Sequence, residues 1–410
     1  MPLNADHELE TIADNLIRFI DRVVLPLELE NRHALNEHGG LYGDDGRMSD
    51  EALALRRQVR MRSAEEGFYT LFGASELGGA GFGARAFAYI QDRLHHKYGP
   101  SHPLIHTVVL PSPFTNGLSP VLRHLPPETF ALYRDDIASG RKTLCFALSE
   151  PDAGSDVFAM TTRAVRDGGD WVITGTKQWI TNSPYADLAM VFAVTDPDLV
   201  RDRRGGVTGF LVSTSAPGFS VPGIIRVMGH KGGDTGIVML DGVRVRDDHR
   251  LGPVDRGLSV ALGGVSAGRL GMSASALGMA RWALDKAIAY ASVRRTFGKP
   301  IAQHQAIQFM LADCAIDIYA AQAMINDCAG LVDSGADSVA QTSIVKAFCT
   351  EMVGRVVDRA MQIHGGMGLA NETGLEAAYR TARIYRIPDG TGEIQRRTIA
   401  GQLLAGGVEL

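Results

Sequence analysis

The sequence has few cysteines, no long apolar run and no excess of basic residues, and each shortage excludes a class of protein. Its 410 residues include 4 Cys, which lie in apolar surroundings without the spacing of a zinc site. No apolar run reaches the roughly 18 residues that a membrane-spanning helix needs. We therefore expect a soluble, cytoplasmic protein with reduced cysteines and no membrane partner.

The charge balance argues against nucleic acid as a partner. The formal net charge is −5, whereas binding to a phosphate backbone needs clustered Lys and Arg. The first residues are acidic where a secretory signal would be basic, so we expect no targeting segment. With 410 residues, of which 45% are apolar, the chain can bury the cores of two or three domains.

The spacing of apolar residues changes twice along the chain. Steps of three and four, as in Leu9, Ile12 and Leu16, are typical of a buried helix face and dominate the first third. Short alternating runs between Gly and Asp clusters then predict an antiparallel β domain, and the helical period returns after Gly257. The predicted domains are helical at 1–139, β at 140–250 and a helical bundle at 251–410. The expected helices span about 9–23, 50–66, 84–97, 127–139, 257–295, 304–333, 338–364, 373–386 and 392–405, and the expected strands about 144–148, 171–174, 188–195, 209–212 and 237–245.

Two other patterns are weak indications of a ligand site. Residues 79–84 fit the dinucleotide-binding pattern G-x-G-x-x-A, but the strand and acidic residue of a βαβ unit are missing, so a Gly-rich helix connection is the better interpretation. His102 and His106 have the i, i+4 spacing of a helical metal pair, yet Pro103 lies between them and no Cys or carboxylate completes a site. We predict no metal site.

Two segments of the predicted β domain suit a planar ligand. Residues 146–156 indicate a strand that runs into a loop of small residues, where backbone and hydroxyl groups can approach a ligand. Residues 177–183 place Trp179 and Thr181 on one strand face, an indole plane beside a hydroxyl donor. A strand Trp is more often a core residue, so this pair alone does not identify a site.

The helical pattern near the C-terminus is interrupted at 386–391. Pro388 cannot continue a helix, because its ring lacks an N–H and clashes with the preceding turn. Asp389 therefore stands just ahead of the next helix, where backbone N–H groups favour an anion, either this carboxylate or a phosphate. An Asp-Gly pair is usually only a turn.

Together with three further segments, these motifs resemble the acyl-CoA dehydrogenase family over nearly the whole chain. The further segments are 294–299, 304–305 and 362–368, and the C-terminal match continues through 390–396. The order helices, β domain, helical bundle is similar to that family's fold. The resemblance implies a mainly α protein with a central antiparallel β-barrel or sandwich, a C-terminal four-helix bundle and a bound FAD.

The resemblance also implies which residues contact FAD. Trp179 would lie against the flavin ring, with the Thr181 hydroxyl near the reactive nitrogen, and Arg294 would offer several donors to the pyrophosphate. Because the family binds part of FAD across a subunit boundary, the resemblance implies an oligomer, a homotetramer or a dimer. The implied cofactor-binding residues are Phe146, Leu148, Ser149, Gly154, Ser155, Trp179, Thr181, Arg294, Thr296, Phe297, Gln305, Gln362, Gly366, Thr391 and Glu393.

The implied reaction is dehydrogenation of an acyl-CoA thioester to the trans-2-enoyl-CoA, with electrons passed to an electron-transfer flavoprotein. Asp389 occupies the position of the family's catalytic Glu and would remove the α-proton while the β-hydride goes to the flavin. Arg269 matches an arginine beside the acyl-CoA. Gly268 excludes a base at the position that some members use. The implied substrate contacts are Ser155, Ser266, Arg269 and Gly390.

The chain departs from the family pattern around this base. Asp is shorter than Glu by roughly 1.5 Å, and Pro388 replaces a common aromatic residue. Pro111 and Pro113 fall in a region that shapes the acyl pocket in the family. We therefore expect a branched, cyclic or otherwise bulky acyl group rather than a straight chain.

Two alternatives stay open. One is an oxidase of the same fold that uses O₂, with an acyl-CoA or a nitroalkane as substrate. The other is a catalytically silent flavin-binding module. If Asp389 is not the base, Glu150 and Glu372 are the next candidates.

Overall fold

The computed structural model describes residues 3, 6–37, 39–112, 116–228, 234–263 and 265–407, and only the backbone of 265–267. The chain forms two compact units, each built from segments that are separate in sequence. Unit 1 comprises Met1–Arg22, Gly83–His102 and Ser266–Leu410, and unit 2 comprises Val23–Phe82 and Pro103–Val265. The N-terminal region therefore contributes to both units. The division at 139/140 and 250/251 remains a prediction about domains.

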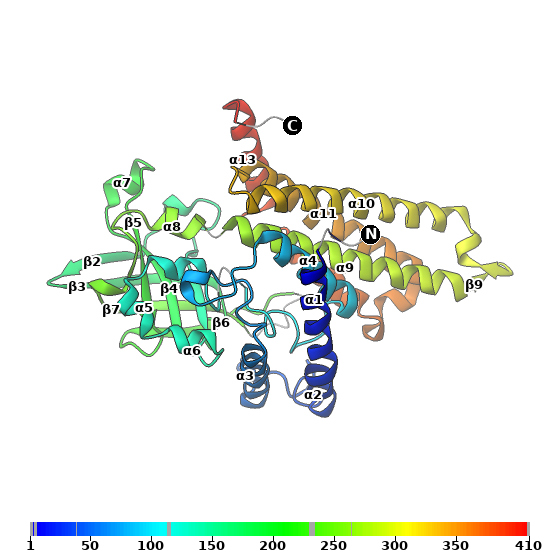
Figure 1. Ribbon diagram of the computed structural model, residues 1–410, viewed down its shortest axis with the longest axis horizontal. Helices are drawn as coiled ribbons and strands as arrows, with labels where there is room; N and C mark the ends of the chain where they lie inside the picture. The colour runs from blue at the N-terminus through cyan, green and yellow to red at the C-terminus, as the bar shows by residue number, and fades with distance from the viewer. Residues whose placement is uncertain are drawn as a thin grey trace. The chain divides into compact units, whose positions relative to one another are not determined.

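Unit 1 is a helical bundle in which α11 is the most enclosed helix. Its residues Cys349, Met352, Val353 and Val356 are spaced by three, one and three, so they share one face, and all four are buried. Helix α11 packs against α10, α12 and α13, and Figure 1 shows the long helices running side by side. The helices of unit 1 are α1 His7–Phe19, α4 Ala84–Tyr98, α9 Val265–Val293, α10 Gln305–Asp333, α11 Val339–His364, α12 Leu375–Tyr385 and α13 Gly392–Leu404.

Unit 2 contains the β domain. Its sheet has the strand order β6-β7-β3-β2-β4-β5-β8, with β1 paired to β4. The strands are β1 Leu144–Ala147, β2 Arg163–Asp167, β3 Asp170–Thr181, β4 Leu188–Val194, β5 Val207–Ser213, β6 Phe219–Ile224, β7 Thr235–Arg246 and β8 Arg250–Leu251. Its helices include α2 Leu25–Glu30, α3 Asp50–Glu65, α5 Pro127–Ala131, α6 Arg134–Ala138, α7 Pro197–Arg201 and α8 Gly257–Gly263.

Strand β4 is buried on both faces and divides the core of unit 2 into two clusters. Leu188, Met190 and Phe192 belong to one hydrophobic cluster, while Ala189 and Val191 belong to the other. This split follows from the alternation of side chains along a strand. The sheet therefore carries apolar packing on each side, as the predicted barrel or sandwich requires.

The predicted sequence of helices, β domain and helices is confirmed, with local corrections. The β domain is not wholly antiparallel, because β1 pairs with β4 in parallel, with Leu144 opposite Leu188. The expected helix at 127–139 is two short helices, interrupted where the Tyr133 hydroxyl lies 2.8 Å from Nε2 of His249. The expected helix at 257–295 is likewise divided into α8 and α9.

The Gly-rich segment 79–84 is a connection, not the turn of a βαβ unit. In the described stretch 39–112 it joins a 3₁₀ turn, Ser75–Leu77, to α4, and no strand precedes it. A Cβ on Gly79 would lie 2.1 Å from the carbonyl oxygen of Gly73, so this residue allows a close backbone approach. Among the described residues, no cluster of His, Cys, Asp and Glu could hold a metal ion, and no helix is long and apolar enough to cross a bilayer.

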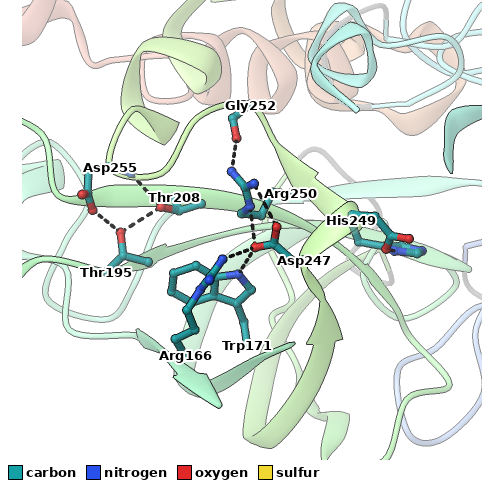
Figure 2. A network of polar contacts seen from close by, with 10 residues as sticks. Arg166, Trp171, Thr195, Thr208, Asp247, His249, Arg250, Gly252 and Asp255 are labelled. Atoms are coloured by element: carbon teal, nitrogen blue, oxygen red, sulfur yellow. Dashed lines mark hydrogen bonds and ion pairs between the residues drawn. The ribbon is translucent and has the colours of Figure 1, made fainter. Parts of the chain in front are cut away.

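One margin of the β domain is held by charged side chains. Figure 2 shows Arg166, Trp171 and Arg250 converging on the carboxylate of Asp247. The indole Nε1 of Trp171 and Nε of Arg250 each donate to Oδ1 of Asp247 at 2.8 Å. These hydrogen bonds, above all those from Arg250, lower the pKa of Asp247 to about 2.

Candidate functional site

The two motifs of the β domain lie side by side in unit 2. The backbone N–H of Gln178, in β3, donates to the carbonyl oxygen of Ser149 at 3.0 Å. Nζ of Lys177 donates to the carbonyl oxygen of Leu148, also at 3.0 Å. The loop that follows β1 is therefore tied to the strand that carries Trp179, although about 30 residues separate them in the sequence.

A buried ion pair supports this junction. Nζ of Lys177 lies 2.8 Å from Oε1 of Glu150, and both side chains are almost inaccessible to solvent. The carboxylate of Glu150 also accepts hydrogen bonds from the backbone N–H of Thr161 and of Thr162 and from the Thr161 hydroxyl. Burial opposes ionisation, but the charge and hydrogen bonds of these neighbours hold the pKa of Glu150 below its usual range.

The backbone turns Trp179 outward at a β-bulge. The register between β3 and β7 shifts between Lys177 and Ile180, and Trp179 itself has φ of +66°, which is rare for a bulky residue. Its side chain is 54% exposed, and Thr181 beside it is exposed too. The indole is thus a surface platform and not a core residue.

These residues fit a planar cofactor. The side chains of Phe146 and Leu148 are half-buried against the core, so they offer an apolar floor with a rigid support. A Cβ added to Gly154 would meet nothing within 4 Å, and Gly154 and Ser155 are both exposed. The loop therefore leaves space beside the indole of Trp179, in which a flat ring can lie against the indole plane.

The base candidate lies in unit 1, on the loop between α12 and α13. Helix α12 ends at Tyr385, before Pro388, and α13 begins after the N-cap Thr391, whose hydroxyl accepts from the backbone N–H of Ile394. Asp389 has φ of +56° and Gly390 has φ of +91°. Gly390 adopts this region freely, but a residue with a side chain such as Asp389 is strained there and needs its surroundings to hold it.

Three side chains hold this loop by its carbonyl groups. Nε of Arg269 donates to the carbonyl oxygen of Asp389 at 3.1 Å, and Nε2 of Gln395 donates to the same oxygen at 3.0 Å. Nε2 of Gln395 also lies 2.9 Å from the carbonyl oxygen of Gly390, to which Nζ of Lys346 donates at 2.7 Å. The three donors come from α9, α11 and α13, so the loop conformation depends on the bundle.

The carboxylate of Asp389 itself is left without a hydrogen bond or ion pair to any described residue. A Cβ on Gly268 would lie 3.2 Å from its Oδ2, so the missing side chain of Gly268 makes room for it. Desolvation by burial raises the pKa of Asp389, and the charges of Lys346 and Arg269 oppose this rise. The carboxylate is therefore disposed to bind a proton.

Lys346 is the residue that the sequence did not single out. It is a fully buried cation in α11. Burial lowers its pKa to about 8, while the charge of Asp389 acts in the opposite direction. A Lys within an apolar helical stripe would have been a usable signal, because an uncompensated buried ammonium is costly.

A second group of predicted residues gathers at the far end of the bundle. Thr296 belongs to a hairpin of strands β9 Arg295–Thr296 and β10 Lys299–Pro300, which Arg294 precedes, and Gln305 begins α10. Gln362 lies near the end of α11 and Gly366 just beyond it, and Tyr290 near the end of α9 stacks on His364. Arg294, Gln305 and Gln362 are exposed, and their side chains make no hydrogen bond within the described chain.

The two groups of predicted residues in unit 1 lie at separate ends of the bundle. Arg269, which contacts the Asp389 loop, and Arg294 are separated by 25 residues along α9, or roughly 37 Å at about 1.5 Å per residue. Phe297, at the tip of the hairpin, is 95% exposed with φ of +50°.

The remaining candidates fall into three groups. The side chain of Ser266 and the whole of Pro113 lie outside the described residues. Glu372 is exposed in a short 3₁₀ turn, and the Glu150 carboxylate is occupied by four donors, so neither resembles a base. Glu393 is exposed at the start of α13.

Comparisons with known proteins identify the family. Residues 145–243 match the model of the acyl-CoA dehydrogenase middle domain, and residues 255–404 match that of the acyl-CoA dehydrogenase C-terminal domain. These matches cover more than half of the chain. The protein belongs to the acyl-CoA dehydrogenase family.

Individual relatives extend the match. The chain is 34% identical over 355 residues to the caffeyl-CoA reductase-Etf complex subunit CarC of Acetobacterium woodii, covering 87% of this chain and 92% of that one. It is 37% identical over 329 residues to the human mitochondrial short-chain specific acyl-CoA dehydrogenase, covering 80% and 78%. Among solved structures, a glutaryl-CoA dehydrogenase from Mycobacterium smegmatis in complex with FADH2 superposes with a TM-score of 0.80 at 26% identity, covering 98% of this chain and 95% of that one.

Proposed function

We propose that this protein is an FAD-dependent acyl-CoA dehydrogenase that converts an acyl-CoA thioester into its trans-2-enoyl-CoA, with Asp389 as the base. The observation that carries the proposal is the state of the Asp389 carboxylate. It is desolvated, it has no hydrogen-bond partner among the described residues, and it stands on a loop held by three side chains. A raised pKa brings a carboxylate closer to the working pH of a general base.

FAD, when bound, would supply the redox chemistry by accepting the β-hydride. Trp179 would bind the ring by stacking, and the Thr181 hydroxyl would donate to it. The exposed group around Arg294 would bind the pyrophosphate and adenosine of FAD held by another copy of the chain. The solved structure of glutaryl-CoA dehydrogenase in complex with FADH2 supports FAD as the cofactor.

The chain's own residues would accept the α-proton and stabilise the negative charge that its removal creates. Removal of the α-proton places negative charge on the thioester oxygen, which needs donors aimed at it. The backbone N–H of Asp389 makes no hydrogen bond within the described chain and is a candidate donor. Arg269, whose Nε holds the loop, would bring positive charge near the acyl group.

An oligomer is part of the proposal. Phe309, Ile316 and Tyr319 are 60%, 67% and 76% exposed and lie on one side of α10. Large apolar side chains collected on one helix face are typical of an association surface. A homotetramer or a dimer would cover them and would bring the Arg294 end of one bundle to a second copy.

For the substrate we propose a branched, cyclic or bulky acyl group, and for the acceptor an electron-transfer flavoprotein. The shorter Asp389 requires the α-carbon to lie about 1.5 Å closer to the loop than a Glu would. The name of the Acetobacterium relative, a subunit of a caffeyl-CoA reductase-Etf complex, supports a bulky acyl group and an association with an electron-transfer flavoprotein.

Anaerobic titration of the FAD-loaded protein with a panel of CoA thioesters tests the proposal. We expect loss of flavin absorbance with at least one thioester, and we expect Asp389→Asn to abolish it while FAD and thioester binding persist. Asp358→Asn, on the exposed side of α11, is the matched control and should behave as wild type.

Three results would change the assignment. Undiminished flavin reduction in Asp389→Asn would move the base elsewhere. Rapid release of peroxide in air, with no need for a ferrocenium acceptor, would indicate an oxidase. Absence of flavin reduction by every thioester in the wild-type protein would indicate a flavin-binding module without this activity.

A further inference from the structure

Lys346 forms an unusual contact for a buried cation. The side chain is completely inaccessible, and its Nζ donates to the carbonyl oxygen of Gly390 at 2.7 Å. Although Asp389 directly precedes Gly390, Lys346 makes no ion pair with its carboxylate. The ammonium therefore holds the backbone of the loop and leaves the carboxylate uncovered.

The charged groups that act on Lys346 come from α9, from α13, from the loop that carries Asp389 and from α11 itself. Asp389 is the largest electrostatic influence after burial, followed by Arg269 of α9, Glu393 of α13 and Glu351 of α11. Glu351 is already paired with Arg396, at 2.7 Å, and Glu393 is exposed. Asp389 is thus the principal anion that the buried ammonium can influence.

The loop also needs the hydrogen bond that Lys346 supplies. Asp389 adopts φ of +56°, a strained region that a non-Gly residue occupies only when its surroundings enforce it. Gly390 cannot be replaced without strain, because a Cβ would lie 2.7 Å from Nε2 of Gln395. Lys346 and Gln395 share the Gly390 carbonyl, so the two side chains act on one peptide group.

We infer that Lys346 is a positioning residue for the base: it fixes the Asp389–Gly390 backbone through the Gly390 carbonyl, and its charge stabilises the ionised carboxylate without a direct hydrogen bond. This inference rests on the proposed function, in which Asp389 accepts the α-proton. A direct ion pair would occupy the carboxylate oxygens, whereas a cation bonded to the neighbouring carbonyl acts through space and leaves both oxygens open to substrate.

Lys346→Met and Gln395→Met separate the two parts of this role. Both variants remove donors to the Gly390 carbonyl, but only Lys346→Met removes a charge. Because the lost charge favoured the carboxylate, we expect the pKa of Asp389 to rise in Lys346→Met and to stay near the wild-type value in Gln395→Met. Both should slow anaerobic flavin reduction, by up to about a hundredfold if the loop moves by about 1 Å.

Infrared titration of the protein measures the Asp389 carboxyl directly, with the band assigned by its loss in Asp389→Asn. The pH dependence of flavin reduction gives the same quantity during turnover. An unchanged Asp389 titration in Lys346→Met would overturn the inference and leave Lys346 with a packing role. If Lys346→Met does not fold, Lys346→Gln, which also removes the charge, gives the same comparison.

The two proposals fail in different ways. If no thioester reduces the wild-type flavin, the proposed function is wrong, and the infrared titration still measures whether Lys346 influences Asp389. If wild-type protein is reduced and Lys346→Met matches it in rate and in pH dependence, the role of Lys346 is wrong and that of Asp389 stands.

Discussion

The protein contains two buried lysines, and each lies near a carboxylate to which it is connected in a different way. In unit 2, Lys177 bonds directly to Glu150, whose oxygens also receive three donors from Thr161 and Thr162. In unit 1, Lys346 bonds to a carbonyl beside Asp389, and the carboxylate receives no donor from the described residues. The difference lies in which oxygen accepts the hydrogen bond.

As a result, the carboxyl pKa shifts in opposite directions at the two sites. Both sites are desolvated, which raises a carboxyl pKa, but at Glu150 the charge and hydrogen bonds of Lys177 outweigh desolvation and the net shift is downward. At Asp389 the through-space charges of Lys346 and Arg269 do not outweigh it, and the net shift is upward. Hydrogen-bond donors occupy the oxygens of Glu150, which gives this residue a structural role. The Asp389 oxygens receive no donor from the described residues, which suits a base.

Of the changes considered at these sites, removal of Lys177 should have the largest effect on stability. Lys177→Met leaves the buried Glu150 without its counter-ion, and loss of one partner from a buried pair typically costs about 3–5 kcal/mol. We expect a large fall in the thermal unfolding midpoint of the FAD-free protein.

The double variant Lys177→Met, Glu150→Gln is the control for this prediction. It removes both charges, so most of the lost stability should return. A single variant as stable as the wild type would show that the pair contributes little to unit 2, in contradiction to the structure.

Filling the space beside the free carboxylate should have an intermediate effect. In Gly268→Ala the new methyl group would lie 3.2 Å from Oδ2 of Asp389, closer than an ordinary van der Waals contact. We expect flavin reduction to slow on the order of tenfold, because small displacements of a reacting group are costly, while FAD binding is unchanged.

Gly354→Ala is the matched control for this prediction. Gly354 lies within α11, and a Cβ there would meet nothing within 4 Å. It should keep the wild-type rate and gain roughly 0.5–1 kcal/mol of stability from helix propensity. Equal rates in the two variants would argue against close packing of the Asp389 carboxylate on α9.

The smallest effect should come from a carboxylate near the surface whose oxygens already accept several hydrogen bonds. Asp247 has several donors, as Glu150 does, but its side chain is 34% exposed. Its pKa is lowered in the folded protein, so its contribution to stability is present above about pH 4 and disappears as the pH falls toward about 2.

Asp247→Asn should therefore lower stability by no more than about 1 kcal/mol at neutral pH. The difference in unfolding midpoint between wild type and variant should vanish in strong acid. A difference that persists below pH 2, or that grows as the pH falls, would contradict this assignment. It would show that the hydrogen bonds to Asp247 do not by themselves set its pKa.

Much of the fold was accessible from the sequence because helix signals are local. The predicted helix at 50–66 is α3, and that at 304–333 is α10, each within one residue at either end. The strands β2, β6 and β8 were missed, since they are short or partly exposed and lack a clear alternation. The parallel pairing of β1 with β4 is a contact between distant segments and leaves no local pattern.

The family resemblance, the order of helices and strands, and the choice of Asp389 as the candidate base depend on residue types and their spacing, so all three could be read from the chain before any coordinates. The assembly of separate segments into two units, and the reach of Lys346 to the Gly390 carbonyl from 44 residues away, became visible only in three dimensions. The physical reason is that a side chain's charge and hydrogen-bonding partner depend on what folding brings within about 3 Å, and no local pattern records that distance.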